Sequence, residues 1–378
     1  MDWRVPLVDL DFDDQEARAV LDVLDHRWIT MGAVTERFEG QFAAFVGADY
    51  AVAVSNATVA LHLACLALGI GPEDEVIVPS LSFVATANAV LYTGAEVRFA
   101  DIIGPDELNI SPDKIEHLIT DRTKAIMVMH YAGYPCRMPE IMEIASRHDL
   151  VVIEDAAHAP GAMLNGRCLG AWGDVGCFSF FSNKNLATGE GGMLVTNREG
   201  IAKKVRLLRS HAMTSVTWDR HRGHAYSYDV VDLGYNYRID EIRSALGLVQ
   251  LSKLGANNAR RKMLTETYWR TLKNCDLELP YLQMLEDPEI QPGYHILPIL
   301  LPEGSDRSVF MGKLRTDGVQ SSIHYPPIHN FSYYSRRYPG VALPITERAA
   351  AREVTLPLYP GMSDDQLSLV IASVQAAL

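Results

Sequence analysis

The segment at residues 150–159 constrains the fold of this chain more than any other feature. It begins with Leu150, two valines and Ile153, and the apolar run then passes into the acids Glu154 and Asp155. Strands that are apolar on both sides are typical of parallel sheets, which helices cover on both faces. The segment therefore predicts a central parallel strand. Ligands of open α/β sheets bind outside the carboxyl ends of the strands, so we expect Asp155 to face a binding site.

Short strands and helical segments alternate along the first half of the chain. Strands are predicted at residues 50–54, 75–79, 95–100 and 124–130. Helices are predicted at residues 12–27, 35–46, 59–68, 112–119, 138–148 and 201–208. This alternation is typical of a doubly wound, mostly parallel sheet with helices on both faces, which is an α/β fold.

The length of the chain predicts two lobes. It has 378 residues, and single hydrophobic cores rarely grow beyond roughly 250–300 residues. Residues 239–273 predict one or two helices that lead into the second lobe, for which we expect strands at 294–300 and 319–325. We expect a large domain at 1–254, with the N-terminal arm included, and a smaller α+β domain at 255–378.

Lys184 lies between an aromatic, β-prone run at residues 177–181 and a glycine-rich turn at 188–192. Glycine lets the backbone come close to a ligand. Burial disfavours the ammonium form of a lysine, so its pKa falls and its amine becomes a nucleophile that can form a Schiff base. A solvated lysine at a strand end, without any chemical role, is an alternative that this stretch leaves open.

Asp155 and Lys184 together match the needs of one cofactor, pyridoxal 5′-phosphate (PLP). PLP needs an anion beside its pyridine nitrogen, so that the ring stays protonated, and a lysine that holds its aldehyde. Asp155 and Lys184 fill these two roles.

The turn before the helix predicted at 59–68 is a candidate phosphate site. Asn56, Ala57 and Thr58 are small residues that follow the strand predicted at 50–54. A helix N-terminus offers free N–H groups and the positive end of the helix dipole, which bind anions. Asparagine and threonine also favour plain helix caps, and this alternative stays open.

Two motifs carry a resemblance to a known family. One is Glu154-Asp155-Ala156-Ala157-His158, and the other is Phe178-Ser179-Phe180-Phe181-Ser182-Asn183-Lys184-Asn185 followed by Gly189-Glu190-Gly191-Gly192. The chain resembles the DegT/DnrJ/EryC1/StrS family of PLP-dependent nucleotide-sugar aminotransferases, which have fold type I of the aspartate aminotransferase superfamily. The resemblance extends from residue 6 to residue 360.

The resemblance implies how the chain holds PLP and its amino form, PMP. Lys184 forms the Schiff base and then shuttles the proton, while Asp155 keeps the pyridine nitrogen protonated. His158 replaces the glutamine that is common in the family and is expected to bond the cofactor 3′-oxygen. Phe83 is expected to stack on the cofactor ring, although core packing is the commoner fate of a phenylalanine.

The phosphate contacts implied by the resemblance come from two subunits. Ser179 is expected to bind the phosphate together with Ala57 and Thr58, where the family usually has glycine in place of Ala57. Asn236 is expected to complete the phosphate site of the other subunit, so the resemblance implies a homodimer with shared active sites.

Contacts with the nucleotide sugar are implied at three places. Met31 and Gly32 are expected near the sugar, although Gly32 also suits a helix stop. His324 and Tyr325 lie beside prolines, and their residue types suit a binding site and a structural role equally well. The resemblance favours a contact with the sugar.

The third place is the polar stretch at residues 210–228. Stretches of this length without secondary structure are usually functional in a compact domain. Arg220 in this stretch and Arg238 after it are donors that suit a nucleotide diphosphate. For the cluster of basic residues around Arg220, a solvated loop is an equally open alternative.

The predicted reaction is the transfer of an amino group from L-glutamate or glutamine to a keto group of a nucleotide-linked deoxysugar, in the biosynthesis of an antibiotic or surface-glycan deoxyaminosugar. The loop at 211–221 resembles members that aminate C4 of dTDP-4-keto-6-deoxyglucose. C3 amination and a PLP-binding regulatory protein without activity are the alternatives. A PLP dehydratase of the same family is disfavoured, because that branch has histidine where this chain has Lys184.

Composition limits the partners and the compartment. The formal net charge of −13 argues against nucleic acid or an anionic membrane as partner. The five cysteines follow no metal-site or disulfide spacing, so we expect reduced thiols, no metal and a cytoplasmic protein. We see neither a signal peptide nor an apolar run of the roughly 18–20 residues that a membrane span requires.

Overall fold

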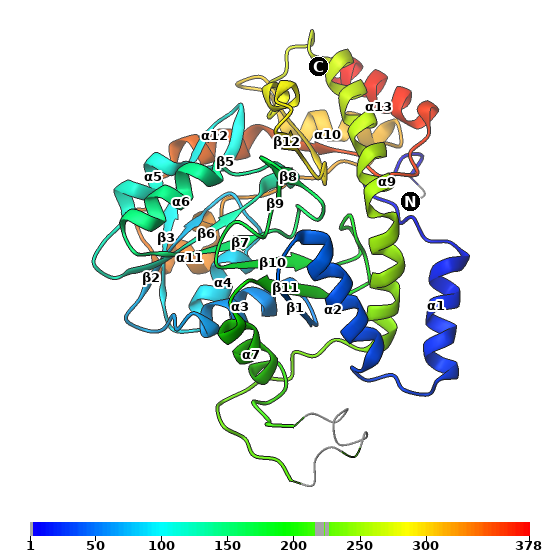
Figure 1. The fold of residues 1–378 in the computed structure, drawn as a ribbon. Coiled ribbons are helices and arrows are strands. Elements are labelled where there is room, and N and C mark those ends of the chain that lie inside the picture. Colours follow the sequence, from blue (N-terminus) through cyan, green and yellow to red (C-terminus); the bar gives the residue numbers. More distant parts are fainter. Residues whose placement is uncertain (1–2, 216–222, 224–226) are drawn as a thin grey trace.

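The centre of the fold is a seven-stranded sheet (Figure 1). The structure is a computed structural model and describes residues 3–215, 223 and 227–378. The spatial order of the strands is β1 (Tyr50–Val54), β11 (Gly192–Thr196), β10 (Val175–Ser179), β7 (Val151–Asp155), β6 (Thr123–Met129), β2 (Glu75–Pro79) and β3 (Glu96–Ala100). β11 runs antiparallel to both of its neighbours, and all other neighbouring pairs are parallel. The predicted α/β class is confirmed.

β7 lies in the middle of this sheet, as its apolar sequence predicted. Successive residues of a strand point to opposite faces of the sheet. Accordingly, Val152 packs into the hydrophobic cluster on one face and Ile153 into the cluster on the other. The first face is covered by α2 (Ala33–Val46), α5 (Pro112–Leu118), α6 (Met138–Arg147) and the first half of α9 (Glu241–Leu272). The second face is covered by α3 (Ala57–Ala67), α4 (Ala85–Leu91) and α7 (Glu199–Leu208).

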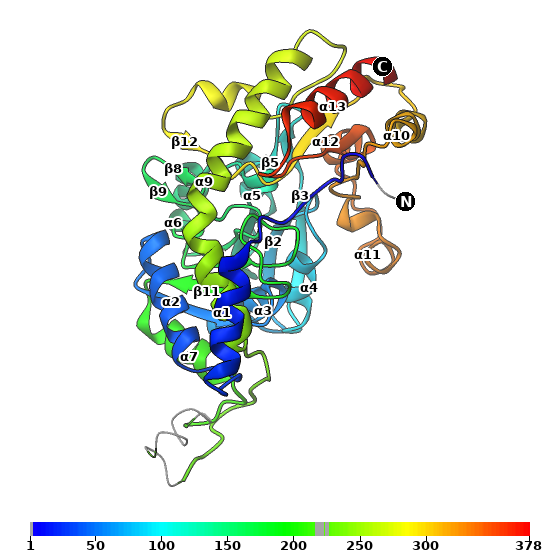
Figure 2. The ribbon, with the colours of Figure 1, turned by 90° about the vertical axis from the view of Figure 1, so that its right-hand side faces the viewer.

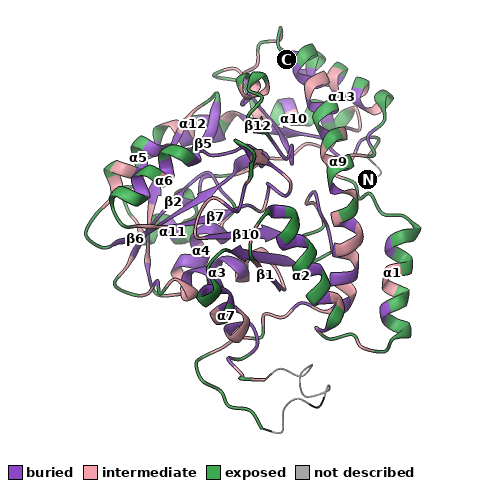
Figure 3. Cartoon of the chain, viewed as in Figure 1, coloured by how far each residue is buried: buried purple, intermediate pink, exposed green. Residues whose placement is uncertain are grey.

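α9 is one helix of 32 residues, which runs along one side of the molecule from the sheet to the C-terminal lobe (Figures 1 and 2). Leu254 packs into the cluster on the first face of the sheet, whereas Leu264 and Trp269 pack into the C-terminal cluster. The domain division at 254/255 therefore stays a prediction, because the helix passes this point unbroken while its two halves join different clusters. α1 (Asp14–Asp25) packs against α9 and is mostly exposed (Figure 3).

The C-terminal lobe combines a small sheet with helices. β13 (Leu297–Leu300) pairs antiparallel with β14 (Glu353–Leu356), and both strands are buried. The helices of this part are α10 (Arg307–Thr316), α11 (Ser332–Arg337), α12 (Pro344–Arg352) and α13 (Asp364–Ala377). The N-terminal residues Arg4 and Val5 donate backbone hydrogen bonds to Gly318, so the N-terminal segment packs against the C-terminal lobe.

The prediction of a strand at 319–325 is wrong. Only isolated bridges form there, between Val319 and Val5 and between Ser322 and Thr355. Pro326 and Pro327 follow directly, and proline has no N–H to donate to a sheet ladder. The strand predicted at 294–300 is shorter than expected, because its pairing with β14 begins only at Leu297.

The remaining elements are short. They are the strands β4 (Ile102–Gly104), β5 (Glu107–Ile110), β8 (Met163–Leu164), β9 (Arg167–Cys168) and β12 (Ile290–Gln291), and the 3-10 turns η1 (Tyr131–Gly133), η2 (Leu282–Glu286) and η3 (Ile328–Asn330). Among the residues that the structure describes, no helix combines the length and the apolar character needed to cross a membrane.

Candidate active site

Several of the predicted cofactor-binding residues lie at the carboxyl edge of the parallel strands. β7 ends at Asp155 and β10 ends at Ser179, and the two strands are parallel. Gly192, at the start of β11, lies in register with both Ser179 and Val54. The turn that follows Val54 and opens α3 is therefore at the same edge as Asp155 and Ser179.

Asp155 is a buried carboxylate with two hydrogen-bond donors. The Thr86 hydroxyl, in the first turn of α4, donates to Oδ2 at 2.8 Å, and the Ala157 N–H donates to Oδ1 at 3.2 Å. Burial raises the pKa of Asp155, and these two hydrogen bonds and the positive charge of Lys184 oppose that rise. A cationic group beside Asp155 would therefore stabilise its ionised form.

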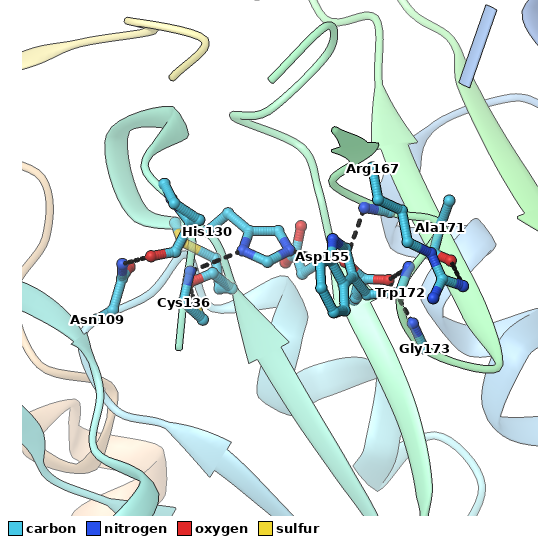
Figure 4. A network of polar contacts seen from close by, with 12 residues as sticks. Asn109, His130, Cys136, Asp155, Arg167, Ala171, Trp172 and Gly173 are labelled. Atoms are coloured by element: carbon cyan, nitrogen blue, oxygen red, sulfur yellow. Dashed lines mark hydrogen bonds and ion pairs between the residues drawn. The ribbon is translucent and has the colours of Figure 1, made fainter. Parts of the chain in front are cut away.

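The neighbouring acid, Glu154, holds the end of β7 in place through polar contacts with residues that include His130, Trp172 and Gly173, which Figure 4 labels. Its carboxylate accepts backbone N–H groups of Gly170, Trp172 and Gly173, each at 2.7 Å, and lies 2.9 Å from His130 Nε2. The Cys136 N–H donates to His130 Nδ1, so Nε2 carries the hydrogen that is donated to Glu154. This network was not predicted from the sequence, although an acid at the end of an apolar strand was its visible signal.

Lys184 is half-buried in the turn after β10, with Nζ 3.3 Å from His295 Nε2. Burial lowers the pKa of Lys184 to about 8, and the charge of Asp155 opposes this shift. The Lys184 side chain is therefore not fully solvated, and its chemical role stays a prediction. His295 was missed, since a single histidine before an apolar strand gives no signal in the sequence.

His158 contacts two residues that come from distant parts of the chain. Its Nδ1 accepts the Ala132 N–H at 3.3 Å, and its Nε2 lies 2.9 Å from the Tyr325 hydroxyl. Burial lowers the pKa of His158 well below its ordinary value, so the ring is neutral and Nε2–H donates to Tyr325. The rings of Tyr325 and Phe83 are 5.9 Å apart, and Phe83 is 53% exposed, so it is not a core residue.

His324 belongs to the same cluster. Its Nδ1 lies 2.8 Å from the Thr355 hydroxyl, whose own hydrogen is donated to Glu353. His324 therefore donates through Nδ1. Burial lowers the pKa of His324 to about 4, and the charge of Lys184 acts in the same direction.

The turn at the start of α3 has the geometry of an anion site. The Asn56 side chain accepts the Val59 N–H at 3.0 Å, while the first N–H groups of any helix have no partner within it. A Cβ atom on Gly192 would lie 2.5 Å from the carbonyl carbon of Asn56, so only glycine lets β11 come this close. Ser179 lies across β11 from this turn and is buried.

Comparison with known proteins identifies the family. The model of the DegT/DnrJ/EryC1/StrS aminotransferase family matches residues 11–375. The chain belongs to this family. It is a PLP-dependent sugar aminotransferase with a fold of type I, as the resemblance implied.

Individual relatives match along the whole chain. SpsC of Bacillus subtilis, a spore coat polysaccharide biosynthesis protein, is 38% identical over 381 residues, which cover 99% of this chain and 96% of SpsC. The aminotransferase TlmJ of Streptoalloteichus hindustanus superposes with a TM-score of 0.91 at 32% identity and covers 100% of this chain and 99% of TlmJ. Spr1654 of Streptococcus pneumoniae, in its PLP form, has a TM-score of 0.89 at 25% identity, with coverage of 100% and 98%.

The site of this aminotransferase fits PLP. The buried Asp155 suits the pyridine nitrogen, and the half-exposed ring of Phe83 offers a face on which a flat heterocycle can stack. The turn that opens α3 offers N–H groups to the phosphate.

The substrate residues predicted for the aminotransferase do not all join this cluster. Met31 and Gly32 line a cavity of about 280 Å³ with Arg209, and none of the cluster residues around Lys184 is among the described residues of its lining. The alternative of a helix-stop glycine is wrong: Gly32 caps the start of α2, and its N–H donates to Glu241.

Of the three other predicted residues, Asn236 and Arg238 belong to a segment beside the phosphate turn, and Arg220 is outside the described part of the chain. The Tyr237 carbonyl, between Asn236 and Arg238, accepts the Ser55 N–H at 2.9 Å. The backbone of residues 236–238 therefore lies beside the turn that precedes α3. Arg238 is half-buried, and burial together with the charge of Arg209 lowers its pKa.

Proposed function

We propose that this aminotransferase moves an amino group from L-glutamate, or from glutamine, to a keto group of a nucleotide-linked deoxysugar. The observation that carries the proposal is that Lys184 and Asp155 lie at one edge of the sheet, close enough for the charge of each to act on the other. With a pKa of about 8, the Lys184 amine is partly neutral near physiological pH. A nucleophile and proton carrier must have a neutral form at working pH, so this amine suits both roles.

The roles that we assign to the chain follow from the contacts in the site. PLP, when bound, supplies an electron sink and carries the amino group. Lys184 would hold the aldehyde of PLP, and its amine would move the proton at the substrate carbon. Asp155 holds a proton on the pyridine nitrogen. The Nε2–H of His158, which donates to Tyr325 in the structure, is the donor that we assign to the 3′-oxygen.

The remaining cofactor contacts are assigned by their place at the sheet edge. The N–H groups of Ala57 and Thr58, capped by Asn56, and the Ser179 hydroxyl are assigned to the phosphate of PLP or PMP. Phe83 is assigned to the face of the ring, where stacking also excludes water. The Ser179 Oγ accepts the Phe181 N–H at 3.3 Å, and this leaves the hydroxyl hydrogen to be donated to the phosphate.

For the acceptor we propose C4 of dTDP-4-keto-6-deoxyglucose. The support is the resemblance of the loop at 211–221 to family members that aminate C4. Residues 216–221 of this loop lie outside the described residues. His324 and Tyr325 reach the cluster around Lys184 and are proposed to contact the sugar. Arg238 and Arg220, with Met31 and Gly32, are proposed to contact the nucleotide part or the sugar across the subunit interface. The similarity to SpsC supports a product that enters a surface glycan.

Incubation of the enzyme with dTDP-4-keto-6-deoxyglucose, PLP and L-glutamate should give a dTDP-4-amino sugar. NMR of the purified product locates the new amine through its couplings along the ring. The Lys184→Ala protein, under the same conditions, is the control and should give no product. An amine at C3 would contradict the proposed position. Reaction with a UDP-sugar but not with this substrate would contradict the proposed acceptor and would retain only the proposal of amino transfer to a nucleotide sugar.

We also propose a homodimer in which Asn236 completes the phosphate site of the partner. The segment before Asn236 carries exposed apolar side chains, among them Leu233, which is 79% exposed. Together with the exposed Val230 and Val231, it forms a patch of the kind that marks protein contacts. Light scattering should therefore give about twice the chain mass of 41.9 kDa. A mass near that of one chain, with activity retained, would rule the dimer out.

For the compartment we propose the cytoplasm. The support is the state of the cysteines, all five of which are free thiols, three of them buried. Free buried thiols suit a reducing environment.

A further inference from the structure

A chain of hydrogen bonds runs behind Lys184 and ends on its amine. The Asn258 amide nitrogen donates to the Pro160 carbonyl at 2.9 Å, and the Asn258 amide oxygen accepts from the Asn185 amide nitrogen at 2.8 Å. Asn185 Oδ1 lies 3.0 Å from His295 Nδ1, and His295 Nε2 lies 3.3 Å from Lys184 Nζ.

The carbonyl groups in this chain settle the direction of every bond. The Asn185 amide nitrogen also donates to the Gly293 carbonyl at 2.6 Å, and a carbonyl oxygen can only accept. The amide oxygen of Asn185 therefore faces His295, and His295 must donate through Nδ1–H. In a neutral imidazole the other nitrogen then has a free lone pair, so Nε2 presents an acceptor to Lys184.

The surroundings keep His295 neutral. The side chain is buried, at 2% exposure, and its ring lies 4.3 Å from the ring of His158 between centroids. Arg261 donates to the His295 carbonyl at 3.2 Å. Burial and the nearby charge of Lys184 lower the pKa of His295 well below its ordinary value, and His158, Arg261 and His324 act in the same direction. The carboxylate that faces Lys184 is Asp155, which opposes the fall of the lysine pKa.

We propose that His295 is a positioning residue for Lys184, whose Nε2 lone pair holds the free amine in place and stabilises the ammonium group that forms when the lysine takes up a proton. This inference deepens the proposed function and rests on it, because it assumes that Lys184 is the residue that carries and releases protons. A hydrogen bond to an ionised donor is stronger than one to a neutral donor, so the acceptor favours the ammonium form. Asn185 and Asn258 act one step further away, by fixing the tautomer of His295.

The test follows the pH dependence of Lys184 labelling in the full-length protein loaded with PMP, in which the lysine amine is free. The protein is acetylated briefly at a series of pH values, and the modified Lys184 peptide is quantified by mass spectrometry. His295→Phe keeps the ring shape but removes the acceptor, so the midpoint should fall by about one pH unit. His295→Gln should restore a midpoint close to that of the unaltered protein, because its amide oxygen is an acceptor of similar reach.

His62→Phe is the matched control. His62 is also a buried histidine, and its ring contacts Tyr92, Tyr235 and Tyr237 on another part of the sheet. This substitution should leave the Lys184 midpoint unchanged. A midpoint that His295→Phe does not lower, or that His62→Phe lowers equally, would overturn the proposal.

A second measurement needs no stable His295→Phe protein. NMR of the unaltered enzyme with ¹⁵N-labelled histidine should show the Nδ1–H tautomer for His295, assigned by the signal that disappears in His295→Gln. The Nε2–H tautomer would refute the proposal. Borohydride reduction and peptide mapping report separately on whether Lys184 carries the cofactor, so a failure of the proposed function is distinguished from a failure of this inference.

Discussion

Lys184→Ala should abolish the covalent link between enzyme and cofactor and lower the transamination rate by at least about 10³-fold, since nucleophile and proton carrier are lost together. A methyl group cannot attack an aldehyde or move a proton. The fold should remain, because the substitution removes a half-buried cationic side chain whose ammonium form burial disfavours. Borohydride reduction followed by peptide mapping should label Lys184 in the unaltered enzyme and no peptide in the variant.

Lys203→Ala is the control for this substitution. Lys203 is an exposed residue of α7 that pairs with Glu199 one turn away, and such surface pairs contribute little to stability. Its loss should leave labelling and rate as they are. If the cofactor were mapped to any other lysine in the unaltered enzyme, the assignment of Lys184 would be wrong.

Local sequence predicted the parts of the site that depend on local chemistry. The apolar run before Asp155 required a strand buried on both faces, and a parallel strand at the centre of a sheet ends at the binding edge. Lys184 follows the next strand in the same sheet, so the two residues meet for topological reasons. Asn56 could likewise be read as a helix cap, and the structure confirms its bond to Val59.

The partners that tune these residues could not be predicted in the same way. His295 is 111 positions from Lys184 along the chain, and the bond between them exists only because the C-terminal lobe folds back over the sheet edge. Thr86 reaches Asp155 over 69 positions, because α4 follows β2, which belongs to the same sheet as β7. The residue types alone do not predict that His295 contacts Lys184 or that Thr86 contacts Asp155, because histidine and threonine occur at many buried positions with other partners.

At residues 319–325 the local sequence favoured a strand, but the surrounding structure prevents one. The segment has β-prone residues, yet pairing depends on a neighbouring strand with free N–H and carbonyl groups. Here Thr355 pairs with Ser322 alone, because β14 already pairs with β13 along its other edge and Pro326 ends the possible ladder. The residues left outside a ladder, His324 and Tyr325, are those that reach the site.

Asp155→Asn should keep cofactor binding and lower kcat by about 10²- to 10³-fold, a loss typical for one electrostatic group that acts in the transition state. The amide has nearly the same shape, so its oxygen can still accept the Ala157 N–H. Its NH2 group can donate to the Thr86 hydroxyl, whose own hydrogen can then go to the Ser82 hydroxyl. A neutral amide, however, does not hold a proton on the pyridine nitrogen. Because the proton matters most while the substrate carbon carries negative charge, kcat should fall much more than KM rises.

Asp101→Asn separates this effect from the general cost of altering a buried aspartate. Asp101 follows β3, is also buried, and accepts the Thr346 N–H at 2.7 Å at the start of α12, away from Lys184. Its substitution should lower the melting temperature and leave kcat nearly unchanged. Asp155→Asn should show the reverse pattern, since burial already disfavours the charge of Asp155 in the protein without cofactor. Near-normal turnover in Asp155→Asn would remove Asp155 from the mechanism, because no other property of the amide could replace the missing charge.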